Sequence, residues 1–147
     1  MALTKTHIKR VLQAIKLADE VRACNCQKVH MGCVIFNGGG GAPVSTGINK
    51  MNKTHPGAGD LYDYPFPHAE FDALFNVPER SLRRATAYVA RRRPDGTLGL
   101  ARPCKYCIKY LKQRGIKTVY FTISNCEIGI LDLRHEEEKV LEYEHER

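Results

Sequence analysis

Two short segments of the sequence place possible metal-binding side chains directly after a proline: PHAE (67–70) and PCKYC (103–107). Apolar residues follow each proline at helical spacing, so both segments are predicted to begin helices. Cys104 and Cys107 lie three residues apart and therefore project from the same face of one helical turn. Any fold in which His68 joins the two cysteines must bring the starts of two separate helices together.

His68, Cys104 and Cys107 offer one nitrogen and two sulfur ligands, a set that suits zinc. A helix N-terminus favours the thiolate form of cysteine that a metal requires. Three protein ligands leave the fourth tetrahedral position open for water, which is typical of a catalytic zinc site. A structural zinc site would need a fourth protein ligand, for which Cys33 and Cys126 are the candidates.

Glu70 follows His68 by two residues. Within a formed helix this spacing would turn the two side chains about 200° apart. At the start of a helix, however, both side chains can reach into the same cavity. A carboxylate beside a metal-bound water can take a proton from that water and deliver it to a substrate. A purely structural zinc site would leave Glu70 unexplained.

Strand-like and helix-like segments alternate along the rest of the chain. Helices are predicted over 4–23, 68–76 and 104–114, the last ended by Gly115, and strands over 31–36, 44–49, 86–93, 117–123 and 127–133. This order predicts an α/β protein, with a single domain over 1–134 built as a three-layer α/β/α sandwich around a mixed five-stranded sheet. The short turn at 124–125 predicts that the last two strands are antiparallel. The glycine run 38–41 lacks the lysine and the Ser/Thr of a phosphate-binding loop, and it is predicted to be a hairpin turn.

Charge is distributed unevenly along the sequence. The net charge is +7, yet residues 135–147 contain six Glu against two basic residues, and residues 1–134 contain 21 Lys and Arg against 10 Asp and Glu. A basic body suggests an anionic partner, either a phosphate-bearing small molecule or nucleic acid, although a solvated surface explains it equally well. The acidic tail over 135–147 is expected to be a short helix or frayed. One hypothesis is that it shields the basic face from nucleic acid.

The sequence carries no sign of membrane insertion or export. No stretch approaches the roughly 18 apolar residues of a membrane span, and the amphipathic N-terminus lacks the apolar core of a secretory signal. A cytoplasmic location is therefore expected, with no membrane partner and with reduced cysteines. Cys24 and Cys26 would then be free thiols, unless they form a second metal site with His30.

The combination of H-x-E with P-C-x-x-C is typical of zinc-dependent deaminases that act on cytosine or adenine. The sequence resembles the cytidine/deoxycytidylate deaminase-like superfamily over almost its whole length: in the opening helix, GIN (47–49), PHAE (67–70), PCKYC (103–107) and GIKTVYFT (115–122). The resemblance implies one zinc ion per chain held by His68, Cys104 and Cys107, with Glu70 as the catalytic general acid and base. Zinc hydroxide would attack C4 of cytosine while Glu70 protonates N3, and loss of ammonia would leave uracil.

The resemblance also implies substrate-binding residues. Asn49 matches the position at which relatives contact the sugar, the backbone of Ala69 matches the position that binds the base edge, and His30 falls where relatives line the pocket. Asn49 would alternatively cap a strand, and His30 would be a structural histidine. Lys50, directly after Asn49, is placed to contact a phosphate. Phe66 and two nearby tyrosines would stack the bases of a single strand, close the pocket or pack the loop.

The substrate stays open between three alternatives. The first is a cytosine nucleoside or nucleotide, and the second is cytosine or adenine in single-stranded DNA or RNA. Arg91–Arg93 and the lysines of the 104–114 helix would bind such a strand, although strand alternation aims Arg91 and Arg93 away from Arg92. The third is an inactive nucleotide-binding homologue, which would be expected to lack Glu70 or a ligand.

Two branches of the superfamily compete in the resemblance. Antiparallel last strands resemble the free-nucleoside branch, whereas one histidine and two cysteines differ from the three cysteines usual there. Guanine or adenine as the target base also stays open, because the metal site does not distinguish the rings and the loops of the pocket decide which base binds. Relatives are often oligomeric, so a homo-oligomer is compatible with the family.

Overall fold

The computed structural model describes residues 3–24, 30–38, 41–49, 69–75 and 77–143. Its helices are α1 (Lys5–Cys24), α2 (Ala69–Leu74), α3 (Glu79–Leu82) and α4 (Lys105–Gln113). Its strands are β1 (His30–Phe36), β2 (Ser45–Ile48), β3 (Thr86–Arg92), β4 (Leu98–Gly99), β5 (Thr118–Ser124), β6 (Glu127–Asp132) and β7 (Glu137–Glu142). The three helices and five strands expected from the sequence are present, and α3, β4 and β7 are additional. In these ranges no helix combines the length and the apolar character needed to cross a membrane.

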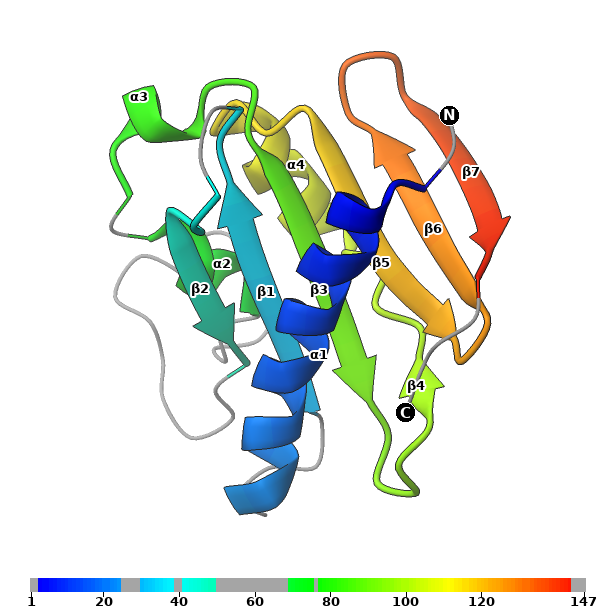
Figure 1. Cartoon of the computed structure of the whole chain (residues 1–147). Coiled ribbons are helices and arrows are strands. Elements are labelled where there is room, and N and C mark those ends of the chain that lie inside the picture. Colours follow the sequence, from blue (N-terminus) through cyan, green and yellow to red (C-terminus); the bar gives the residue numbers. More distant parts are fainter. Residues whose placement is uncertain (1–2, 25–29, 39–40, 50–68, 76, 144–147) are drawn as a thin grey trace.

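The strands of the described chain form one mixed sheet with the order β2-β1-β3-β5-β6-β7, and β4 pairs with β3 (Figure 1). β3 and β5 run parallel, whereas the other pairs are antiparallel. The mixed sheet and the antiparallel hairpin of β5 and β6 are therefore confirmed. The expected number of five strands is too small, because β4 and β7 extend the sheet.

The prediction of a short helix or a frayed end after residue 134 is wrong, because β7 forms an edge strand. It pairs with β6 from Glu127↔Glu142 to Asp132↔Glu137. Leu141 packs against the apolar core beneath α1, while the glutamates of β7 stay exposed. Charged edge strands are common in proteins because charge opposes pairing with the edge of another sheet. The same charges hide this strand from any search for apolar alternation.

Alternate residues of the central strands fill two apolar cores, one on each face of the sheet. The core beneath α1 includes Val11, Ile15, Val34, Tyr88 and Tyr120. The core on the other face includes Cys33, Ala73, Val89, Leu111 and Phe121. Because α1 covers one face and α2 and α4 cover the other (Figure 1), the three-layer α/β/α sandwich is confirmed.

Two glycines let helices approach the sheet more closely than a side chain would permit. A Cβ at Gly32 of β1 would lie 2.5 Å from the Ala14 carbonyl oxygen of α1. A Cβ at Gly47 of β2 would lie 2.4 Å from both the Ala69 carbonyl oxygen and the Ala73 nitrogen of α2. The first turn of α2 is therefore seated directly on β2.

The ends of α2 and α4 are tied together by one arginine. α4 ends where the sequence predicts, at Gly115, which has a left-handed φ of +95°. Arg114, the residue before it, donates hydrogen bonds to the carbonyl oxygens of Leu74 (3.0 Å) and Val77. It also donates to the Tyr110 hydroxyl at 2.8 Å. Since Leu74 ends α2, Arg114 fixes α2 and α4 relative to each other at this end.

Candidate active site

Cys104 and Cys107 occupy the first turn of α4, as the sequence predicts. Cys104 is the N-cap residue, and its Sγ accepts a hydrogen bond from the Cys107 N–H at 3.5 Å. Cys107 is fully buried and Cys104 is partly buried. A sulfur that accepts a backbone N–H at the positive end of a helix is stabilised as a thiolate, the form that binds zinc. The two cysteine sulfurs at the start of α4 are therefore suitable ligands for zinc.

α2 and α4 pack against each other through aromatic rings and the two cysteines. Phe71 of α2 and Cys107 form a small buried cluster, which Cys104 and Tyr110 border. The rings of Phe71 and Tyr110 are stacked, with their centroids 4.9 Å apart. The structure therefore brings the first turn of α2, which carries Glu70, beside the first turn of α4.

Glu70 is buried at 2% exposure and lies close to Cys33 of β1. Burial raises the pKa of the Cys33 thiol well above its ordinary value, and the nearby carboxylates of Glu70 and Asp72 raise this pKa further. Both effects favour the neutral thiol over the thiolate form that binds a metal. Cys126, the other candidate for a fourth ligand, is exposed in the turn between β5 and β6. Neither cysteine suits a four-ligand structural zinc site.

Three residues singled out in the sequence lie outside the residues that the structure describes. They are His68, which is the third predicted zinc ligand, Lys50 and Phe66. Within the described ranges, His, Cys, Asp and Glu side chains do not gather in groups of three or more that would hold a metal. The structure also does not describe the side chain of Cys24 or any part of Cys26, so the second metal site stays a prediction.

Asn49 directly follows β2 and is buried at 5% exposure. Its Oδ1 accepts a hydrogen bond from the Met31 N–H of β1 at 2.8 Å. The bond ties the start of β1 to the end of β2, as the strand-capping alternative would have it. The contact of Asn49 with a sugar stays a prediction.

Asp72 anchors the first turn of α2, a role that no sequence motif indicates. Its Oδ2 accepts a hydrogen bond from the Ile48 N–H of β2 at 3.1 Å. With Gly47 beneath Ala69, this bond fixes the backbone at the start of α2, where Ala69 is predicted to meet the base. The sequence signal was a second carboxylate in the first helical turn, a position that the helix dipole favours.

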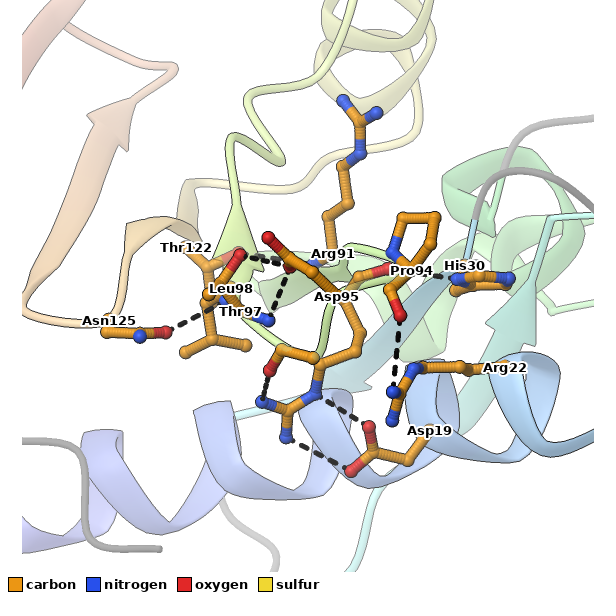
Figure 2. Close-up of polar contacts among 12 residues, drawn as sticks. Asp19, Arg22, His30, Arg91, Pro94, Asp95, Thr97, Leu98, Thr122 and Asn125 are labelled. Atoms are coloured by element: carbon orange, nitrogen blue, oxygen red, sulfur yellow. Dashed lines mark hydrogen bonds and ion pairs between the residues drawn. The ribbon is translucent and has the colours of Figure 1, made fainter.

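His30 begins β1 and lies on the α1 face of the sheet, the face opposite to Cys33. Its Nδ1 donates a hydrogen bond to the Arg92 carbonyl oxygen at 3.1 Å (Figure 2). With Asp19, Arg22 and Arg92 it lines a pocket of about 710 Å³. The bond to Arg92 is what the structural alternative for His30 requires. A substrate contact of this residue stays a prediction.

Two cations near α4 are paired with the acidic segment 135–147. Arg102 Nε donates to Glu138 at 2.6 Å, and Lys112 Nζ donates to Glu136 at 2.9 Å. Exposed ion pairs of this kind contribute little to stability. Their main effect is to reduce the positive charge of this surface, which is the contact that the shielding hypothesis requires.

One known family matches a part of the chain that includes the starts of both α2 and α4. A family model described as the cytidine and deoxycytidylate deaminase zinc-binding region matches residues 4–123. The chain belongs to this deaminase family. The resemblance carried by HAE and PCxxC is therefore confirmed. The matched residues include Cys104 and Cys107, whose binding of zinc stays a prediction.

Solved structures of Acinetobacter baumannii RibD are similar to this chain. Form 1 superposes with a TM-score of 0.52 at 26% identity, and form 2 with a TM-score of 0.51 at 27% identity. Each similarity covers 82% of this chain but 29% of the RibD chain. The chain therefore spans less than a third of the length of these proteins. Among proteins of curated function, none matches the sequence.

Proposed function

We propose that this chain is a zinc-dependent hydrolytic deaminase that converts cytosine to uracil in a nucleoside or nucleotide. One water is consumed and one ammonia is released for each base converted. The observation that carries this proposal is the buried carboxylate of Glu70 in the first turn of α2, the helix that packs through Phe71 against Cys107 of α4. Membership of the deaminase family supports the reaction class.

His68, Cys104 and Cys107 would hold the zinc ion. Cys104 and Cys107 present their sulfurs from one helical turn, at a helix end that favours thiolates. Zinc in such a site lowers the pKa of a bound water and acts as a Lewis acid.

Glu70 would move the protons of the reaction. Its carboxylate takes a proton from the attacking water and delivers it to N3 of the cytosine ring, which makes C4 more electrophilic. A second transfer through the same carboxylate protonates the departing amino group. Because Glu70 is shielded from bulk water, its protons pass between water and substrate rather than to solvent. Asn49 and the backbone of Ala69 would hold the sugar and the base edge against it.

The direct test is ammonia release by the zinc-loaded protein with cytidine, deoxycytidine, their 5′-monophosphates and cytosine-containing single strands, and with adenosine and guanosine for comparison. Glu70→Gln keeps the shape of the side chain and removes the proton carrier, so kcat should fall by about 10²- to 10⁴-fold. Glu79→Gln, the same change at an exposed position of α3, should leave kcat unchanged.

Two results would overturn the proposal. Equal turnover by wild type and Glu70→Gln would remove Glu70 from the chemistry. A zinc-loaded wild type that releases ammonia from adenine or guanine compounds, but from no cytosine compound, would replace the target base.

A further inference from the structure

Arg91 and Arg92 end β3, Arg93 directly follows it, and the three arginines divide between the two faces of the sheet. Arg92 lies on the α1 face, where it donates hydrogen bonds to both carboxylate oxygens of Asp19 and to the Gly96 carbonyl oxygen. Arg91 extends in the opposite direction, on the side of α4 (Figure 2). Because side chains alternate along a strand, Arg92 makes structural contacts on the α1 face, whereas Arg91 lies on the face covered by α2 and α4.

Arg91 and Arg93 run side by side across Gly99 of β4. A Cβ at Gly99 would lie 2.9 Å from Arg93 Nε and 3.3 Å from Arg91 Cδ. The glycines with a positive φ in the described chain are Gly96 and Gly115, so Gly99 is not required by a turn. Its missing side chain instead makes room for two arginine stems, which we call the Arg91–Arg93 pair.

Thr122 of β5 holds the strands beneath the Arg91–Arg93 pair in place. Its Oγ1 accepts a hydrogen bond from the Arg91 N–H at 3.1 Å and donates to the Gly99 carbonyl oxygen at 2.8 Å (Figure 2). Thr122 is fully buried, so this link is protected from water. The position of Arg91 is therefore set by the sheet, the kind of rigid support that a binding site needs.

Within the described part of the chain, neither guanidinium of the pair forms a side-chain hydrogen bond or an ion pair with a protein group. Hydrogen bonds donated by the Thr97 hydroxyl and N–H lower the pKa of the Asp95 carboxyl, and the nearby charge of Arg93 lowers this pKa further. Two like charges held near each other repel, and an anion bound between them removes that repulsion. The planar fork of a guanidinium matches two phosphate oxygens at once.

The pair lies at the same end and on the same face of the sheet as Asn49. Gly47 faces α2, so Asn49, two residues later, points to the same side. Arg91 stands directly opposite Met31, whose N–H is bonded to Asn49 Oδ1. Two strand spacings, about 10 Å, therefore separate Asn49 from Arg91. An arginine side chain spans much of this gap, so a phosphate attached to a sugar at Asn49 would meet the pair.

We propose that Arg91 and Arg93 bind a phosphate of the substrate, so that the chain acts on phosphorylated cytosine compounds in preference to the free nucleoside. This inference rests on the proposed deaminase function for the site at Asn49 and Glu70. The phosphate has two possible sources: the monoester of a free nucleotide or the phosphodiester of a single strand.

The test is calorimetric binding to zinc-loaded protein that carries Glu70→Gln, which prevents turnover of the ligand. Deoxycytidine 5′-monophosphate, deoxycytidine and inorganic phosphate are titrated into R91Q/R93Q and into the parent. R80Q/R83Q is the matched control, because it also removes two positive charges. Arg80 and Arg83 are exposed and lie on and directly after α3, near the start of β3 rather than its end.

Affinity for the monophosphate should fall about 10- to 100-fold in R91Q/R93Q, since bonds to a charged phosphate are lost. Affinity for deoxycytidine should change less than about twofold on the same reasoning, and the control should match the parent. Unchanged monophosphate binding in R91Q/R93Q, or an equal loss for nucleotide and nucleoside, overturns the inference. A parent protein that binds neither the monophosphate nor inorganic phosphate also overturns it.

Two further arms sharpen the result. The first arm measures how the affinity for oligodeoxycytidine depends on salt concentration, in R91Q/R93Q and in the parent. If the slope of log K against log[salt] is smaller in R91Q/R93Q by about 0.7 for each lost contact, the pair binds a phosphodiester. If the slope is unchanged while monophosphate binding is lost, the pair binds the monoester. Gly99→Ala displaces the arginine stems without removing charge, so it should weaken monophosphate binding as well. If the pair binds nucleotide and the active protein deaminates no cytosine compound, the phosphate site stands and the proposed reaction falls.

Discussion

Arg92 and Asp19 form a two-bond ion pair that joins the end of β3 to α1. Arg92 Nε donates to Asp19 Oδ1 at 2.7 Å, and Arg92 Nη2 donates to Oδ2 at 3.1 Å. The Arg92 side chain is 14% exposed, whereas that of Asp19 is 43% exposed. Arg92 is therefore a structural arginine, and the phosphate-binding role proposed here belongs to its two neighbours on the other face.

Asp19→Asn is expected to lower the free energy of unfolding by about 1–2 kcal/mol, because it weakens the pairing of a largely buried guanidinium. Urea denaturation measures the effect. A double-mutant cycle with Arg92→Met should show that the two changes are not additive, since both remove the same interaction. Full additivity would mean that the pair contributes nothing to stability.

Arg114→Lys is expected to lower the free energy of unfolding by about 2 kcal/mol, because an ammonium cannot reproduce the forked bonds to Leu74 and Val77. Arg102→Lys is the control, since Arg102 makes an exposed ion pair, and it should change stability by less than about 0.5 kcal/mol. Equal effects in the two variants would show that Arg114 does not clamp α2 to α4.

His7 makes stability depend on pH. Burial lowers the pKa of its imidazole below the usual 6.5, and the positive charges of Arg10 and Lys117 lower this pKa further. The folded protein then binds fewer protons than the unfolded chain as the pH falls below 6.5. The stability that neutral His7 contributes is complete above pH 6.5 and is lost as the pH falls through the folded pKa.

Denaturation of wild type and His7→Gln at pH 8, 6.5 and 5 tests this dependence. The His7 Nδ1 accepts the Thr4 N–H at 3.4 Å, and its Nε2 bonds to the Tyr120 hydroxyl at 3.2 Å. Wild type should lose stability relative to His7→Gln as the pH falls below 6.5. A difference that stays constant across this range would show that His7 keeps its ordinary pKa on folding.

Local chemistry made parts of this protein predictable from sequence. The three-residue spacing of Cys104 and Cys107 after a proline predicts a shared helical turn, and Gly115 predicts the end of that helix. Both are decided by residues within a few positions of one another. The antiparallel hairpin of β5 and β6 follows in the same way from a turn too short for any other connection.

Contacts between residues far apart in the chain could not be predicted from the sequence. β7 is stabilised by pairing with β6 and by Leu141, while its charged residues give no apolar pattern. The position of His30 could not be predicted without the strand register, because a shift of one residue decides on which face of the sheet its side chain lies. Asp72 holds β2 through a backbone N–H, and no side-chain pattern reveals such a partner.

Zinc binding gives the sharpest test of the two helix starts. Cys107→Ser should reduce bound zinc from one ion per chain to nearly none, because an alcohol is a far weaker zinc ligand than a thiolate. Cys126→Ser, the same change in an exposed turn, should keep full zinc content by elemental analysis.

At a free zinc concentration of 100 times Kd, bound zinc stabilises the fold by about 2.7 kcal/mol. A chelator should therefore lower the Tm of wild type and Cys126→Ser but not that of Cys107→Ser. Equal zinc content in both variants would place the metal elsewhere and remove Cys107 from the site.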